Sequence, residues 1–115
     1  MGVLTVRAIR TFPEHGGAAV DHDSVDVAEA GLTGDRRRKA AVSLIGDDSP
    51  ATRANFVLDG PTAQVEALDG RVLRIGDVIL AVTTTGSHCA GLYGSVGESG
   101  TVRVGDVVEV MGGGG

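Results

Sequence analysis

The sequence predicts a single all-β domain, mainly β with little helix, folded as a closed or nearly closed β-barrel. Its apolar residues are mostly Val, Leu, Ile and Ala, and aromatic residues make up only 3% of the chain. Glycine occurs 19 times in 115 residues and proline three times, which favours short strands with tight turns over a helical bundle. A closed barrel is the simplest arrangement of such strands because it leaves no long strand edge exposed.

Four segments carry strand patterns. Residues 4–8 and 24–28 alternate apolar and polar side chains, as expected of strands with one buried face. Residues 39–45 and 77–82 are almost continuously apolar, which predicts interior strands covered on both faces. Asp, Gly and Pro residues between these segments supply the turns.

Residues 61–68 fit two structures. Pro61 suits the first position of a helix, whereas Ala63, Val65 and Ala67 alternate as in a strand. Because glycine interrupts most candidate helices in this chain, we expect a strand here.

A short motif occurs twice, as Arg-Ile-Gly-Asp-Val-Ile at residues 74–79 and as Arg-Val-Gly-Asp-Val-Val at 103–108. Each copy predicts a hairpin corner in which Gly adopts a left-handed conformation and Asp bonds nearby backbone N–H groups. We assign these aspartates no chemistry.

The composition is that of one globular domain, residues 1–110, followed by a flexible glycine tail at 111–115. No apolar run approaches the roughly 20 residues that span a bilayer, and the first residues lack the pattern of a secretory signal. A single cysteine fits a reducing compartment, so we expect a cytoplasmic protein without membrane contact. The net charge of −5 and the absence of Trp argue against nucleic acid as a partner.

Cys89 is the candidate for chemistry, because it lies in the polar segment 83–91 that follows an apolar strand. A lone cysteine is often only a small buried apolar residue. Here the preceding Ser87 and His88 favour a loop, and an adjacent imidazole promotes the thiolate. The histidines and Cys89 lack zinc-site spacing, His88 is poorly placed as a catalytic base, and no phosphate-binding glycine loop is present.

Basic residues form a second candidate site. Residues 36–39 hold four of the ten basic side chains of an otherwise acidic chain. Arg53 and Asn55 lie at the start of a predicted strand, where residues two apart point to the same side. Arginine binds phosphate through paired hydrogen bonds and Asn can bond a heterocycle edge, so these residues suit an anionic, pterin-like ligand. The alternative for 36–39 is a solvated run of charge.

Five motifs occur in an order that resembles the MOSC domain, the C-terminal domain of molybdenum cofactor sulfurases. They are residues 24–37 (SVDVAEAGLTGDRR), 53–60 (RANFVLDG), 73–78 (LRIGDV), 88–89 (HC) and 102–106 (VRVGD). The resemblance covers residues 3–110, and the 53–60 motif is most similar to the branch that includes the mitochondrial amidoxime-reducing component.

This resemblance implies a β-barrel that binds the molybdenum cofactor, molybdopterin. It implies that Cys89 is the catalytic residue, either as the protein ligand to molybdenum or as the carrier of a sulfane sulfur. Asp35 and Arg36 match the family's Gly-Asp-Arg corner, and Arg53 and Asn55 match positions that contact the cofactor. Pyridoxal phosphate binding is not expected. The stretch between residues 38 and 53 is shorter than in most members, which removes part of the pocket wall.

Three functions follow from the resemblance. The first is an oxidoreductase that reduces N-hydroxylated small molecules at a Cys-ligated molybdenum centre and needs an electron-donor protein. The second is a sulfur-transfer relay in which Cys89 carries a persulfide received from a sulfur-donor protein. The third is a non-catalytic accessory domain that hands the cofactor to a partner. A homodimer is one way to complete the shortened pocket. The glycine tail at 111–115 suggests a further alternative, because ubiquitin-like sulfur carriers end in Gly-Gly and receive their sulfur there as a thiocarboxylate.

Overall fold

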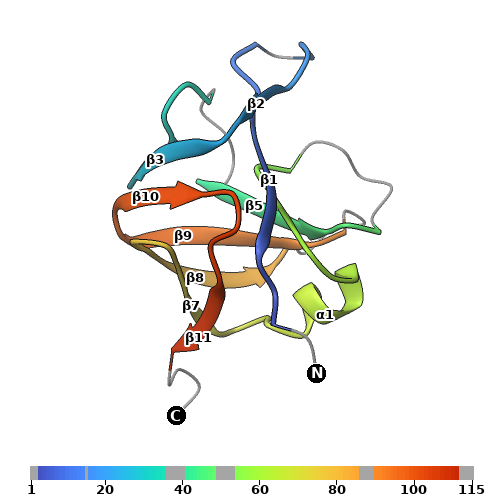
Figure 1. Ribbon diagram of the computed structural model, residues 1–115. Coiled ribbons are helices and arrows are strands. Elements are labelled where there is room, and N and C mark those ends of the chain that lie inside the picture. The colour runs from blue at the N-terminus through green and yellow to red at the C-terminus, as the bar shows by residue number, and fades with distance from the viewer. Residues whose placement is uncertain (1–2, 15, 36–40, 49–53, 86–89, 112–115) are drawn as a thin grey trace.

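In the computed structural model (Figure 1), the residues that the structure describes are 3–14, 16–35, 41–48, 54–85 and 90–111. The structure is mostly β, with 55% strand and 5% helix, which confirms the predicted mainly β class. The elements of the described residues are β1 (Val6–Thr11), β2 (Val20–His22), β3 (Ser24–Ala28), β4 (Gly31–Leu32), β5 (Val42–Gly46), β6 (Phe56–Leu58), α1 (Thr62–Glu66), β7 (Val72–Ile75), β8 (Val78–Thr84), β9 (Leu92–Glu98), β10 (Gly100–Arg103) and β11 (Val108–Met111). Within this part of the chain, no helix has the length and apolar character needed to cross a membrane.

The strands form two sheets. The large sheet has the order β11-β7-β8-β9-β5-β6-β1-β2, and the small sheet has the order β10-β3-β4. Neighbouring strands are antiparallel except β5 and β6, which run parallel with Leu44 beside Phe56. Figure 1 shows the large sheet curling around one side of the molecule, with β3 and β10 above it.

A closed or nearly closed barrel was predicted, and the large sheet is instead a curled half-barrel that is open, not closed. Strand β1 pairs with β6 along one edge and, through residues 9–11, with β2 along the other. Near the start of β1, the described residues meet the segment before β11 through one isolated bridge, between Thr5 and Val107, and no regular ladder joins β1 to β11. Two backbone hydrogen bonds flank this bridge, from Val6 N to Asp106 O and from Val108 N to Leu4 O, each 2.9 Å long.

The hydrophobic core lies inside the curl and is made of Val, Leu and Ile with Phe56. Strand β5 is buried on both faces over most of its length, as its apolar sequence predicts. Strand β8 is not, since Ala81 is exposed between the buried Leu80 and Val82, and Thr83, which follows Val82, is exposed as well. The prediction of two-sided burial is therefore wrong for β8. Its apolar run includes Ala81, and the small alanine side chain is tolerated at a solvent-facing position.

Residues 62–66 form the short helix α1, so the predicted strand at 61–68 is wrong. Val65 is fully buried whereas Ala63 and Ala67 are exposed, so the three residues do not share one face. The helix start is held by tertiary contacts: Thr62 N donates to Asp48 Oδ1 at 2.7 Å, and Gly46 N donates to Thr62 Oγ1 at 3.1 Å.

The repeated Gly-Asp motif forms two different corners. Gly76 and Gly105 both have positive φ values, +59° and +96°, as predicted. The first copy is a hairpin between β7 and β8, but the second joins β10 of the small sheet to β11 of the large one, so the second is not a hairpin. Asp106 Oδ2 accepts a hydrogen bond of 2.8 Å from Arg103 N, in agreement with the predicted role of that aspartate.

Candidate functional site

Two of the predicted cofactor-binding residues, Asp35 and Asn55, are hydrogen-bonded to each other. Asn55 Nδ2 donates to Asp35 Oδ2 at 3.1 Å. Asp35 lies in the turn that follows β4, and Asn55 directly precedes β6. The structure therefore brings together two predicted residues that are 20 positions apart in the sequence.

Asn55 is fully buried, and each side of its amide is bonded to the protein. Its Oδ1 accepts hydrogen bonds from Ser43 N at 3.0 Å and Ser43 Oγ at 3.2 Å. Besides the bond to Asp35, its Nδ2 donates to Arg10 O at 3.1 Å. A primary amide has two N–H donors and a carbonyl with two lone pairs, so these four bonds use its full capacity.

Asp35 is anchored through both carboxylate oxygens. Its Oδ1 accepts a short hydrogen bond of 2.7 Å from Phe12 N, at the end of β1, while Oδ2 accepts from Asn55. Hydrogen bonds to an ionised carboxylate are stronger than those between neutral groups. The turn after β4 is thus fixed to both β1 and the start of β6.

Strand register and one glycine create this arrangement. Parallel pairing of Leu44 with Phe56 puts Ser43 next to Asn55, and Asn55 N donates to Ser43 Oγ at 3.1 Å. Gly31 has φ +123°, and a Cβ there would lie only 2.6 Å from Ala41 O. Glycine at position 31 therefore allows the segment leading into β5 to pack against β4.

The remaining predicted site residues, Cys89, Arg36 and Arg53, lie outside the described residues. The chain on either side of segment 86–89 is held near α1. Thr84 N donates to Asp69 Oδ1, and Gly91 N donates to Glu66 Oε2, each at 2.9 Å.

Gly91 also fixes where this segment enters β9. It has φ +93°, and a Cβ at this position would contact Leu44 O on β5. Leu92 then pairs with Leu44, and Tyr93 with Ser43.

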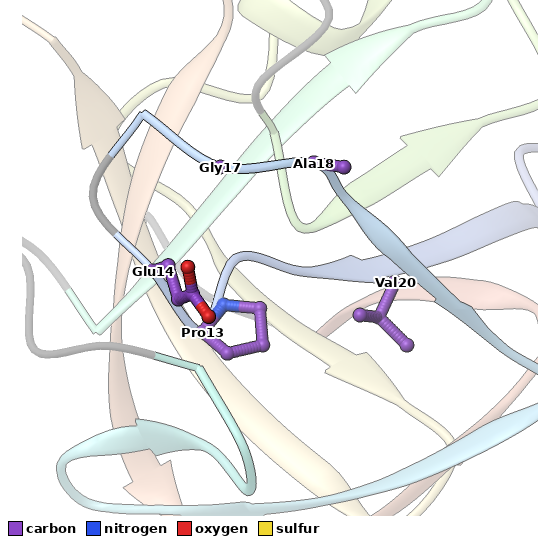
Figure 2. Close-up of a pocket in the computed structure, with 5 residues that line it drawn as sticks. All are labelled: Pro13, Glu14, Gly17, Ala18 and Val20. Carbon is purple, nitrogen blue, oxygen red and sulfur yellow. The ribbon is translucent and has the colours of Figure 1, made fainter.

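A shallow hollow of about 290 Å³ lies on the connection between β1 and β2, close in sequence to Phe12. Figure 2 shows its lining, in which the Glu14 carboxylate lies beside the Pro13 ring, with Ala18 and Val20 across the opening. Gly17 N donates to Glu14 O at 3.0 Å and closes the turn beneath it. Asp35 and Asn55, the two predicted site residues that the structure describes, do not line this hollow.

One carboxyl group in the described part of the chain has a clearly shifted pKa. Hydrogen bonds from the backbone N–H and the side chain of Thr62 lower the pKa of Asp48 below its ordinary value of 3.8. This group stabilises the start of α1. Across the described ranges, no three His, Cys, Asp or Glu side chains lie together as a metal site would require.

Sequence reasoning did not single out Ser43, although its hydroxyl both donates to and accepts from Asn55. The sequence does mark this position, because Ser43 is the one polar residue within the apolar run 40–45. A hydroxyl in an interior strand needs a hydrogen-bond partner, which could have directed attention to this position.

Comparison with known proteins adds to the description of the fold. No family model matches the sequence, and no curated protein matches it significantly. Eight chains of solved structures match, among them the three that follow. A hypothetical protein aligns over 95% of this chain and 68% of its own length, with a TM-score of 0.73 and 19% identity. YuaD from Bacillus subtilis aligns over 93% and 94%, with a TM-score of 0.71 and 11% identity.

The third similar structure is YiiM from Escherichia coli, a MOSC-domain protein. It aligns over 94% of this chain and 68% of its own length, with a TM-score of 0.62 and 18% identity. The fold is MOSC-like. At these identities the likeness bears on the fold alone.

Proposed function

We propose that this MOSC-like chain binds the molybdenum cofactor and reduces N-hydroxylated small molecules. The observation that supports the proposal is the hydrogen bond between Asp35 and Asn55. Asp35 belongs to the Gly-Asp-Arg corner of the family resemblance, and Asn55 belongs to the Arg-Ala-Asn motif. A cofactor site built from both motifs requires that they meet in space.

Chain connectivity limits how far the two predicted arginines can lie from this point. Arg36 directly follows Asp35, and Arg53 precedes Asn55 by two positions. Because consecutive Cα atoms are about 3.8 Å apart, each arginine Cα lies within about 8 Å of the Cα of Asp35 or Asn55. Guanidinium groups bind phosphate through paired hydrogen bonds, so Arg36 and Arg53 are the proposed ligands of the cofactor's phosphate.

Cys89 is the proposed thiolate ligand of the metal. Leu92, three residues after Cys89, pairs with Leu44 on β5, and Leu44 directly follows Ser43. The segment that carries Cys89 therefore joins the strand whose Ser43 bonds Asn55. A thiolate is a suitable donor for a soft metal centre. When bound, the cofactor would supply oxygen-atom exchange with the substrate, while the chain would hold both of its ends. Electrons would come from a donor protein.

Molybdenum content tests the proposal. The protein is produced in a host that makes the cofactor, purified without oxygen, and analysed for molybdenum per chain as wild type and as Cys89→Ala. We expect near-stoichiometric metal in the wild type and a large loss in the variant. Arg36→Ala and Arg53→Ala should also lose metal, whereas Arg74→Ala, at an exposed position on β7, should not.

Wild-type protein without molybdenum would contradict the reductase proposal. Intact-mass measurement of that protein then distinguishes the two remaining functions. One additional sulfur atom on Cys89, absent in Cys89→Ala, favours a persulfide relay. An unmodified thiol together with cofactor release to a partner protein favours an accessory domain.

A further inference from the structure

Hydrogen bonds join the side chains of Ser43, Asn55 and Asp35 to one another and to backbone groups of Arg10 and Phe12; these five residues are here called the Asn55 network. Asn55 at its centre is fully buried. Both of its amide hydrogens and both lone pairs of its carbonyl oxygen already have partners within the protein. A ligand that bonded this amide would have to displace one of these partners and leave it buried and unsatisfied.

The Asn55 network joins chain segments that are distant in sequence. It connects the end of β1, the turn after β4, the start of β5 and the start of β6. Asp35 is the last described residue before segment 36–40, and Asn55 lies two residues after segment 49–53. The two segments that carry Arg36 and Arg53 are therefore joined to the fold at opposite ends of one hydrogen bond.

From this arrangement we infer that Asp35, Asn55 and Ser43 are positioning residues. They hold the attachment points of Arg36 and Arg53 at a fixed separation, and they do not contact the bound anion themselves. This inference rests on the proposed function for the identity of the ligand. It changes the role that the family resemblance implies for Asn55, from a contact with the cofactor to a support for the arginines.

Exchanging the side chains of Asp35 and Asn55 tests whether these residues position the arginines or contact the anion themselves. Asn55→Asp alone puts a second carboxylate against Asp35 and against Arg10 O, so it should lower the melting temperature strongly. Asp35→Asn combined with Asn55→Asp restores an amide-to-carboxylate bond in the opposite direction and keeps acceptors for Phe12 N and Ser43. Among the hydrogen bonds of the Asn55 network, the double variant loses the bond to Arg10 O and keeps the others, so it should be more stable than Asn55→Asp.

Ser43 provides a second, conservative test. Ser43→Ala removes the hydroxyl that bonds Asn55 in both directions, whereas Ser43→Thr keeps it and adds a β-branch that suits a strand. Ser95→Ala on the neighbouring strand β9 is the matched control, because Ser95 Oγ is exposed and makes only a long contact of 3.5 Å with Ala81 O.

Anion binding is measured with inorganic pyrophosphate as the probe, by NMR titration of the side-chain N–H signals. We expect pyrophosphate to shift the guanidinium signals of Arg36 and Arg53 and to leave the Asn55 NH₂ signals unchanged. Affinity should fall at least tenfold in Asn55→Asp and Ser43→Ala, and should recover in the double exchange and in Ser43→Thr. The same four variants are compared for molybdenum per chain after expression in a cofactor-producing host.

Besides a failure to bind pyrophosphate at all, three results would overturn the inference. They are a large shift of the Asn55 NH₂ signals on titration, a double exchange that regains stability without regaining pyrophosphate affinity, and a double exchange no more stable than Asn55→Asp. Absence of molybdenum from a wild type that binds pyrophosphate as expected contradicts the proposed function and supports the positioning role. Absence of any pyrophosphate binding contradicts the positioning role.

Discussion

Asn55 Nδ2 lies 3.1 Å from Asp35 Oδ2, and neither residue lies within a strand. The bond instead fixes a turn after β4 to the entrance of β6. Loops that carry function are commonly mobile, and a scaffold must restrain them where geometry matters. In this chain the restraint comes from a buried side-chain amide in place of a longer strand ladder.

Replacing Asn55 with Ala should destabilise the protein markedly. The substitution leaves Ser43 N, Arg10 O and one oxygen of Asp35 without their partner. Each buried group left unsatisfied costs about 1–3 kcal/mol, so we expect a total loss of about 3 kcal/mol or more in the free energy of unfolding. Denaturant titration of the wild type and the variant measures this difference in the free energy of unfolding. Glu109→Ala, at an exposed position of β11, is the control and should cost less than about 1 kcal/mol.

Gly46→Ala should also be strongly destabilising. A Cβ at this position would contact Thr62 N and Gly60 O and lie 2.6 Å from the carbonyl carbon of Pro61. All three are backbone atoms, so the start of α1 would have to move away from β5, at a cost of about 2–3 kcal/mol. Gly97→Ala is the matched control, because the nearest atom to its Cβ would be Ile79 O at an ordinary 3.6 Å. Equal melting temperatures of the two variants would contradict this packing.

Gly91→Ala and Gly105→Ala separate steric contact from backbone strain. Both positions have similar positive φ values, +93° and +96°. An alanine Cβ at Gly91 would contact Leu44 O, whereas no atom lies within 4 Å of one at Gly105. Gly105→Ala should therefore cost about 1–2 kcal/mol from the left-handed conformation alone. Gly91→Ala should lower stability clearly more than Gly105→Ala does. Thermal unfolding of the two variants measures the difference.

Stability should depend on pH through Asp48. Hydrogen bonds from Thr62 lower the pKa of Asp48 in the folded state below 3.8, so the unfolded chain binds the proton more readily. The stabilising contribution is complete at pH values above the unfolded pKa and disappears as the pH falls through the folded pKa. The stability difference between wild type and Asp48→Asn should therefore shrink below pH 3.8.

Asp23→Asn, at an exposed position between β2 and β3, changes the net charge by the same amount and is the control. A stability difference between wild type and Asp48→Asn that stays constant down to the acid transition would show that the hydrogen bonds from Thr62 do not depend on the charge of Asp48.

The sequence patterns predicted most strands because alternation reflects which face is buried. Residues 24–28 are predicted with the bounds that β3 has, with Val25 and Val27 inward. At 61–68 the alternation of apolar residues predicted a strand, which was wrong. The segment forms helix α1, whose start is held by Asp48 and Gly46 from a different part of the chain. Such tertiary contacts override a weak local preference and leave no mark in the segment itself.

The candidate site was only partly accessible from sequence. Motif order was enough to place Asp35 and Asn55 in one candidate site, and they lie within hydrogen-bond distance of each other. That the amide of Asn55 is saturated depends on the register of β6 against β5, which sets Ser43 beside it. Register in a parallel pair separated by a connection is a three-dimensional property, so the sequence alone could not reveal it.

The central pairings of the large sheet also determine when the protein can fold. Leu44 pairs with Leu92, 48 residues later, and Ile9 pairs with Phe56, 47 residues later. The chain loses the entropy of closing such large loops before these contacts can stabilise it. We therefore expect a folding time in the range of milliseconds to seconds. During synthesis, β5 cannot acquire its β9 neighbour until that strand has left the ribosome. Until then one edge of β5 stays open to association with other nascent chains.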